Sequence, residues 1–104
     1  MRSPELVVTR EVVVDMVRLA AEEVPGVLRV GHGGPAWLAF RHGDPVRVRI
    51  EESRVEVRVV IVARPAQSLV ALARGVRASV AAACERLLGL DAASVTVVVD
   101  GVGA

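Results

Sequence analysis

The stretch VRVRIEESRVEVRVVIVA at residues 46–63 decides the fold of this chain. Within Val46–Glu51, valine or isoleucine alternates with a charged residue, and Arg54–Ala63 repeats this alternation over most of its length. An apolar residue at every second position is typical of a β-strand that buries one face. Only Glu52 and Ser53 separate the two segments, so we expect them to form a tight antiparallel hairpin.

A long amphipathic helix is predicted on each side of this hairpin, because apolar residues recur there at a spacing of three to four. The first helix spans Thr9–Val24, with Thr9 as its N-cap, and Pro25–Gly26 ends it. The second helix begins after the N-cap Ser68 and ends before Gly89. The predicted apolar faces comprise Val13, Met16, Val17, Ala20 and Val24 in the first helix, and Leu69, Leu72, Ala73, Val76, Val80, Ala83, Cys84 and Leu87 in the second.

Short strands are expected at Val27–Val30 and Val95–Val99, with a further edge strand at Leu6–Val8. The glycine-rich segment before the hairpin has room for about two turns of helix at Pro35–His42. The last strand follows the second helix, so it can pair in parallel with the hairpin through a crossover. This order predicts an α+β fold, a two-layer sandwich in which two long helices pack on one face of a small mixed β-sheet. Because the chain has neither a repeat nor a linker, we expect residues 1–104 to form a single domain.

The composition excludes several classes of protein. Apolar residues make up 53% of the chain, with 24 Val and 15 Ala but one Phe, one Trp and no Tyr. Such a chain is too apolar to be disordered. Its 13 basic and 12 acidic residues leave a net charge of +1, which argues against nucleic acid as a partner, because nucleic-acid-binding domains usually have a basic excess. All 13 basic residues are arginine, as expected of a GC-rich genome.

Cysteine usage and hydropathy indicate where the protein works. Cys84 is the single cysteine and cannot form an internal disulfide, which favours a reducing compartment. The N-terminus lacks the apolar segment of a signal peptide. The best candidate for a membrane span, Ser68–Leu88, contains four charged side chains. We therefore expect a cytoplasmic protein with no transmembrane segment of its own.

No set of residues typical of catalysis or metal binding is visible. His32 and His42 are ten positions apart with Asp44 as the nearby carboxylate, which does not match the spacing of a metal site. Cys84 lies on the apolar face of the second predicted helix, where a thiol packs as a small hydrophobe. Gly31–Gly34 has the GxxG spacing of KH domains, so a KH-like nucleic-acid-binding module is the alternative to an interaction protein. We expect neither enzyme activity nor a cofactor.

A charged group of residues is the first candidate for an interaction surface. Arg47, Arg49 and Arg58 should project from one face of the hairpin, beside Glu51 and Glu56. They form either a solvated face with weak ion pairs or the polar rim of an interface.

An apolar group is the second candidate. Val60, Val62 and Val98 lie on the sheet face opposite the predicted helices, and an exposed apolar patch there would favour self-association or partner binding. Cover by a chain terminus is the alternative. Trp37 and Phe40, the only aromatic residues, either close one end of the core or form an exposed anchor for a partner.

Three segments together resemble the alkaline shock protein family, the envelope stress response proteins of Gram-positive bacteria. They are VVTREVVVDMVRLAAEEVPGVLRV at 7–30, the hairpin at 46–63, and SLVALARGVRASVAAACERLLGLDAASVTVVVDGV at 68–102. In the family, a helix ends in a VPGV-like turn, a hairpin follows, and a long helix closes with a Gly-Leu pair before a valine-rich strand that ends in a Gly-Val-like dipeptide. The corresponding residues here are Val24–Val27, Gly89–Leu90 and Gly101–Val102.

The chain departs from the family pattern in two places. The middle loop is shorter than is common and carries Trp37 and Phe40, and Arg64–Ala66 stands where members often have an aromatic-Gly pair. The resemblance implies a non-enzymatic cytoplasmic interaction or scaffold protein of cell-envelope homeostasis, with no catalytic residues to carry over. In some members it implies self-assembly and presence at the membrane through a membrane-anchored partner. We therefore expect a homo-oligomer or a pairing with a related small protein.

Overall fold

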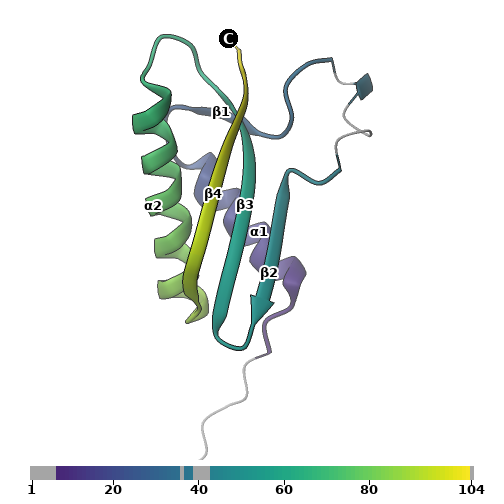
Figure 1. Ribbon diagram of the computed structural model, residues 1–104, viewed down its shortest axis with the longest axis vertical. Coiled ribbons are helices and arrows are strands. Elements are labelled where there is room, and N and C mark those ends of the chain that lie inside the picture. Colours follow the sequence, from purple (N-terminus) through teal and green to yellow (C-terminus); the bar gives the residue numbers. More distant parts are fainter. Residues whose placement is uncertain (1–6, 36, 39–42, 104) are drawn as a thin grey trace, which may run out of the picture.

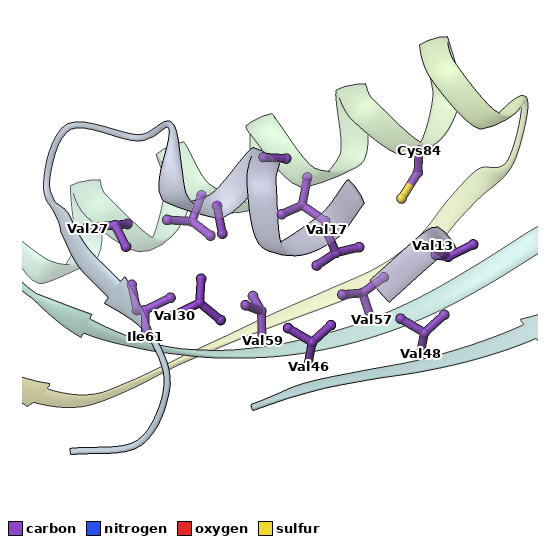
Figure 2. Close-up of a cluster of buried hydrophobic side chains, with 14 of the residues drawn as sticks. Val13, Val17, Val27, Val30, Val46, Val48, Val57, Val59, Ile61 and Cys84 are labelled. Carbon is purple, nitrogen blue, oxygen red and sulfur yellow. The ribbon is translucent and has the colours of Figure 1, made fainter. Parts of the chain in front are cut away.

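The computed structural model describes residues 7–35, 37–38 and 43–103. In chain order the elements are α1 (Arg10–Glu22), β1 (Val27–Val30), β2 (Val46–Glu51), β3 (Arg54–Ala63), α2 (Leu69–Leu88) and β4 (Asp91–Val102). Figure 2 shows both helices on one side of the strands, with buried side chains between the two layers. The expected two-layer α+β sandwich is confirmed.

The hairpin that dominates the sequence is present as β2 and β3. The two strands pair antiparallel from Val46 opposite Val59 to Glu51 opposite Arg54. Glu52, the first residue of the two-residue turn, has φ of 54°. A positive φ at the first turn residue but not at the second, Ser53, is typical of a type II′ turn, where glycine is usual at the first position. Because the turn contains no glycine or asparagine, its type could not be predicted from the sequence.

β3 is the central strand, and its two edges have different partners (Figure 1). One edge pairs antiparallel with β2 and then with β1. The partner changes at Val60, whose N–H donates to the Pro45 carbonyl at 2.8 Å and whose carbonyl accepts from the Gly31 N–H at 2.9 Å. The other edge pairs in parallel with β4. The sheet is therefore mixed, as expected, and β1 and β2 follow each other along one edge.

The predicted helix caps are confirmed. Thr9 Oγ1 accepts a hydrogen bond from the Val12 N–H at 3.4 Å, and Ser68 Oγ accepts one from the Ala71 N–H at 3.2 Å. Gly89 ends α2 with φ of 64°, in the left-handed region that glycine adopts without a steric penalty.

The core lies between the helices and the helix-facing side of the sheet (Figure 2). Leu69 and Leu87 were expected there but are 40% and 63% exposed, so this part of the prediction was wrong. Both residues follow the spacing of the buried side of α2, but they lie in its first and last turns, at the ends of the buried row. The buried residues of the helices are Val13, Val17, Ala20 and Ala21 in α1, and Leu72, Val76, Val80 and Cys84 in α2.

β4 is longer than the predicted strand Val95–Val99. It spans Asp91–Val102, because pairing with β3 holds residues such as aspartate, serine and glycine that have low β-propensity on their own. The predicted edge strand at Leu6–Val8 is wrong for Val7 and Val8, which belong to no strand, and Leu6 lies outside the described residues.

The helix expected at Pro35–His42 falls largely outside the described residues. Of its described part, Trp37 and Leu38 form a short turn, in which the Leu38 N–H donates to the Pro35 carbonyl at 3.0 Å.

Candidate interaction surface

The face of the sheet that points away from the helices, here called the open face, is seen from the front in Figure 1. Successive strands contribute alternate residues to it, and the strand register sets them in rows. The three arginines expected to share a face do so, and all the side chains in their two rows are exposed. One row contains Arg47, Arg58 and Thr96, and the next contains Arg49, Glu56 and Ser94.

Arg49 has acidic partners within this face. Its guanidinium lies 2.8 Å from Glu51 Oε1 and 3.8 Å from Glu56 Oε2. At the end of the hairpin, Arg54 Nε lies 3.9 Å from Asp91 Oδ2 of β4. All these side chains are more than half exposed, so each pair contributes at most about 1 kcal/mol to stability.

Among the described residues, Arg47 and Arg58 have no such acidic partners. Their Cα atoms are direct partners in the β2–β3 ladder, so two cations face each other across the strands. Neither side chain forms an ion pair with the residues that the structure describes. Like charges directly opposite each other destabilise a sheet. This row is therefore the part of the open face that would gain most from an anionic partner.

Val60 and Val62 do not form an exposed patch, which corrects the expectation for them. Their side chains are 1% and 4% exposed. The segment that follows β1 meets the end of β4 beside Val62. There the Gly33 N–H donates to Asp100 Oδ2 at 2.8 Å, and His32 Nδ1 lies 3.5 Å from the same oxygen. An internal loop and the end of β4 thus cover the two valines.

Glycines allow this cover because the backbones approach closely. A Cβ added at Gly33 would overlap the carbonyl oxygen of Asp100. A Cβ added at Gly103 would lie 3.1 Å from Leu28 Cδ2 and 3.7 Å from Val62 Cγ1. The GxxG spacing therefore belongs to a loop that follows β1 and packs on β4, whereas the corresponding loop of a KH domain joins two helices. Sequence reasoning missed this role of Gly33, and the only sign of it was the local density of glycine.

Val98, Trp37 and Phe40 complete the set of predicted interaction residues. Val98 is half-buried on β4. Trp37 is 67% exposed, so it does not close the end of the core. Phe40 lies outside the described residues. A role of these residues in binding stays a prediction.

The described residues offer little for catalysis. No group of three or more His, Cys, Asp or Glu side chains among them could hold a metal ion, and His42 lies outside the described part. Cys84 is 1% exposed, and its burial, together with the nearby charge of Glu85, raises the pKa of its thiol. A buried thiol that stays protonated acts as a small apolar side chain.

Neither helix in the described part of the chain combines the length and the hydrophobicity that crossing a membrane would require. α2 is the longer, with 20 residues, and its exposed side carries Arg74 and Arg77. Its buried residues, Leu72, Val76, Val80 and Cys84, belong to the core.

Solved structures of MamM CTD have a similar fold. The copper form of MamM CTD superposes with a TM-score of 0.61 at 22% identity, over 88% of this chain and 85% of that chain. Two variants of MamM CTD match with TM-scores of 0.58 and 0.57 at 22% and 23% identity. They cover 89% and 88% of this chain, and 98% and 95% of their own. At this level of identity the likeness shows a shared fold.

The family comparison goes further than the fold. No curated protein sequence matches this chain. The family model of alkaline shock protein 23, described by a cell envelope-related function, matches residues 2–104. This match includes the helix, hairpin and crossover segments that carry the resemblance in the sequence. The chain therefore belongs to the alkaline shock protein 23 family.

Proposed function

We propose that this chain is a non-catalytic interaction module with a cell envelope-related role. It works on the cytoplasmic side of the membrane, by self-association and by docking on a membrane-anchored protein. The observation that carries the proposal is the facing pair of Arg47 and Arg58 on the open face. Membership of a family with a cell envelope-related function supports the setting.

The positive charges of Arg47 and Arg58 indicate that the docking partner presents an acidic group. Each guanidinium presents a planar fork of N–H donors that matches a carboxylate. An acidic side chain placed between Arg47 and Arg58 would relieve their repulsion and accept hydrogen bonds from both. The partner therefore presents Asp or Glu to the middle of the open face, between the ion-paired Arg49 and the buried Val60.

The chemistry of the remaining side chains supports binding rather than catalysis. An attacking thiolate needs a lowered pKa and access to substrate, whereas Cys84 is buried with a raised pKa. Two acidic side chains of the hairpin, Glu51 and Glu56, lie next to Arg49. Such an arrangement suits a surface that recognises a partner by charge.

Membrane fractions from the source organism provide the test. The purified chain is mixed with native membranes, with protease-treated membranes and with vesicles of the extracted lipid, and bound protein is measured after sedimentation. A membrane-anchored protein partner predicts binding to native membranes that is lost after protease treatment. Binding to the lipid vesicles, or no binding to native membranes, would overturn the proposal of a protein partner.

A matched pair of double variants assigns the binding to the open face. Changing Arg47→Gln with Arg58→Gln should lower the affinity for native membranes by about 10-fold or more. Changing Arg74→Gln with Arg77→Gln removes the same charge from the exposed side of α2 and should leave the affinity unchanged. Equal loss in both variants would mean that net charge alone drives binding.

A further inference from the structure

Within the part of the chain that the structure describes, β4 has a hydrogen-bonded partner on one side. It spans 12 residues, Asp91–Val102, and pairs with β3 along its length. Among the described residues no strand lies along its other edge (Figure 1). The N–H and C=O groups of an open edge are available to pair with another strand.

The hydrogen bonds of β3 show how its backbone groups alternate. The N–H and C=O of Val60 both bond toward β1 and β2. Because neighbouring residues of a strand point these groups to opposite edges, odd-numbered residues of β3 direct theirs toward β4. Two bonds at the ends of the ladder agree: the Asp91 N–H donates to the Ser53 carbonyl at 2.7 Å, and the Gly103 N–H donates to the Ala63 carbonyl at 2.9 Å.

The outward-pointing groups of β4 follow from this alternation. In a parallel ladder, a residue that faces the neighbouring strand bonds to the two residues that flank its partner, and the partner itself points away. The partners of Val57, Val59 and Ile61 are Val95, Val97 and Val99, respectively. These three valines of β4 therefore direct their N–H and C=O groups to the open edge.

The middle of this edge lacks the charged residues and the proline that often keep edge strands apart. The run AASVTVVV at Ala92–Val99 contains no charged residue and no proline. Shifts in the register with β3 occur at Ala93 and at Asp100–Gly101. They leave Ser94–Val99 as a regular segment between two irregular ends.

Along β4 the side chains that face the core are less buried than those of β3. Val95, Val97 and Val99 pack against it but stay half-buried, whereas their partners on β3 are at most 3% exposed. We propose that the open edge of β4 pairs antiparallel with β4 of a second copy of this chain. The proposal rests on the proposed function as an interaction module and names the surface through which copies associate.

A two-fold axis at Val97 satisfies the outward-pointing groups of the three valines. Val97 then faces Val97 of the second copy, and Val95 faces Val99, so that three residue pairs each exchange two hydrogen bonds. The half-buried valines of the two copies meet on the helix side. On the open face, Thr96 lies beside Val98 of the second copy, and no like charges are brought together. This self-complementarity is the reason for choosing a second copy over an unrelated strand.

Amide hydrogen exchange read by NMR tests the seam, alongside mass from light scattering over a range of concentrations. We expect a dimer at high concentration. The amides of Val95, Val97 and Val99 should exchange rapidly in the monomer and slow by about 10-fold or more on association. The amides of Thr96 and Val98, bonded to β3, should be protected in both states. A chain that stays monomeric, or a dimer that leaves the three outward amides unprotected, would overturn the proposal.

Two variants block the seam in different ways. Val97→Pro removes an outward N–H that β3 does not use and should weaken dimerisation by about 10-fold or more. If that variant does not fold, Thr96→Lys adds a charge at an exposed position and should have the same effect, with Thr96→Val as the control that still dimerises. A dimer that persists in the folded blocking variant contradicts the seam. If Val97→Pro, which lies on the helix side and outside the arginine row, still binds native membranes as a monomer, the docking function stands whatever happens to the seam.

Discussion

Arg47 and Arg58 are direct partners across β2 and β3, at the centre of the open face. The other charged cross-strand pairs of this face, Arg49–Glu56 and Glu51–Arg54, join opposite charges. The hairpin therefore pairs charges favourably at its turn end and unfavourably at its middle. Binding of an acidic group at this row would remove a repulsion as well as add an attraction, which links partner binding to the stability of the free chain.

Replacing Arg58→Glu should stabilise the free chain. It converts the repulsive pair with Arg47 into an attractive one, with a gain of about 0.2–1 kcal/mol in the free energy of unfolding. Urea titration measures the gain, and Arg58→Gln, which only removes the repulsion, should fall between the two. The gain should shrink in 1 M salt, where charges on the surface are screened. A loss of stability in low salt would mean that the guanidinium groups of Arg47 and Arg58 do not repel each other in the parent chain.

The hairpin and the helix ends could be predicted because the sequence specifies them locally. Alternating residues determine the inward and outward faces of β2 and β3, and Thr9, Ser68 and Gly89 act within a few residues of themselves. The same alternation brought Arg47 and Arg58 to one face.

The cover over Val60 and Val62 could not be predicted in this way. It depends on Gly33 meeting Asp100, which is 67 residues away in the chain. Alternation correctly placed the two valines on the face opposite the helices, but it carries no information on what lies over them. The open edge of β4 was missed for a related reason, since only the order of strands in the sheet shows which edge lacks a partner.

Gly33→Ala should destabilise the chain. The added methyl group would overlap the Asp100 carbonyl oxygen, which belongs to the backbone and can move only if β4 or the loop moves. We expect a loss of about 1–3 kcal/mol in the free energy of unfolding, measured in urea, and faster exchange of the backbone amide at position 33, which in the parent chain donates to Asp100. Unchanged stability would mean that the backbone at Gly33 does not pack closely against Asp100 of β4.

Gly75→Ala is the matched change with the opposite sign. Gly75 lies in the middle of α2, and a Cβ there would meet Val24 Cγ1 at 3.7 Å, an ordinary contact distance. Alanine should stabilise the helix by about 0.5–1 kcal/mol, because it loses less backbone entropy on folding. The same urea titration tests it, and a loss of stability would show that Val24 packs on α2 more tightly than this distance allows.

Val60→Asp should unfold the chain rather than probe an interface. Its side chain is 1% exposed, and an unpaired charge buried there costs about 3–5 kcal/mol, a large part of the stability of a chain this small. Val98→Asp, at a half-buried position, should keep the fold. Circular dichroism at 25 °C separates the two outcomes. A folded Val60→Asp variant would mean that the loop gives way and leaves the position open to water.

Cys84 should make the stability of the chain fall at alkaline pH. Burial raises the pKa of its thiol in the folded state, so above about pH 8.5 the unfolded chain loses the proton first and is favoured. The contribution of the thiol is complete below that pH and is lost as the pH rises toward the folded-state pKa, with a slope of at most about 1.4 kcal/mol per pH unit.

The chain contains no lysine and no tyrosine, so among its side chains only Cys84 titrates between about pH 9 and 11. Urea titrations across this range should show the decline in the parent chain and a nearly flat profile in Cys84→Ala, which starts from a lower stability. Parallel profiles for the two proteins would mean that the thiol is as accessible to water in the folded chain as in the unfolded one.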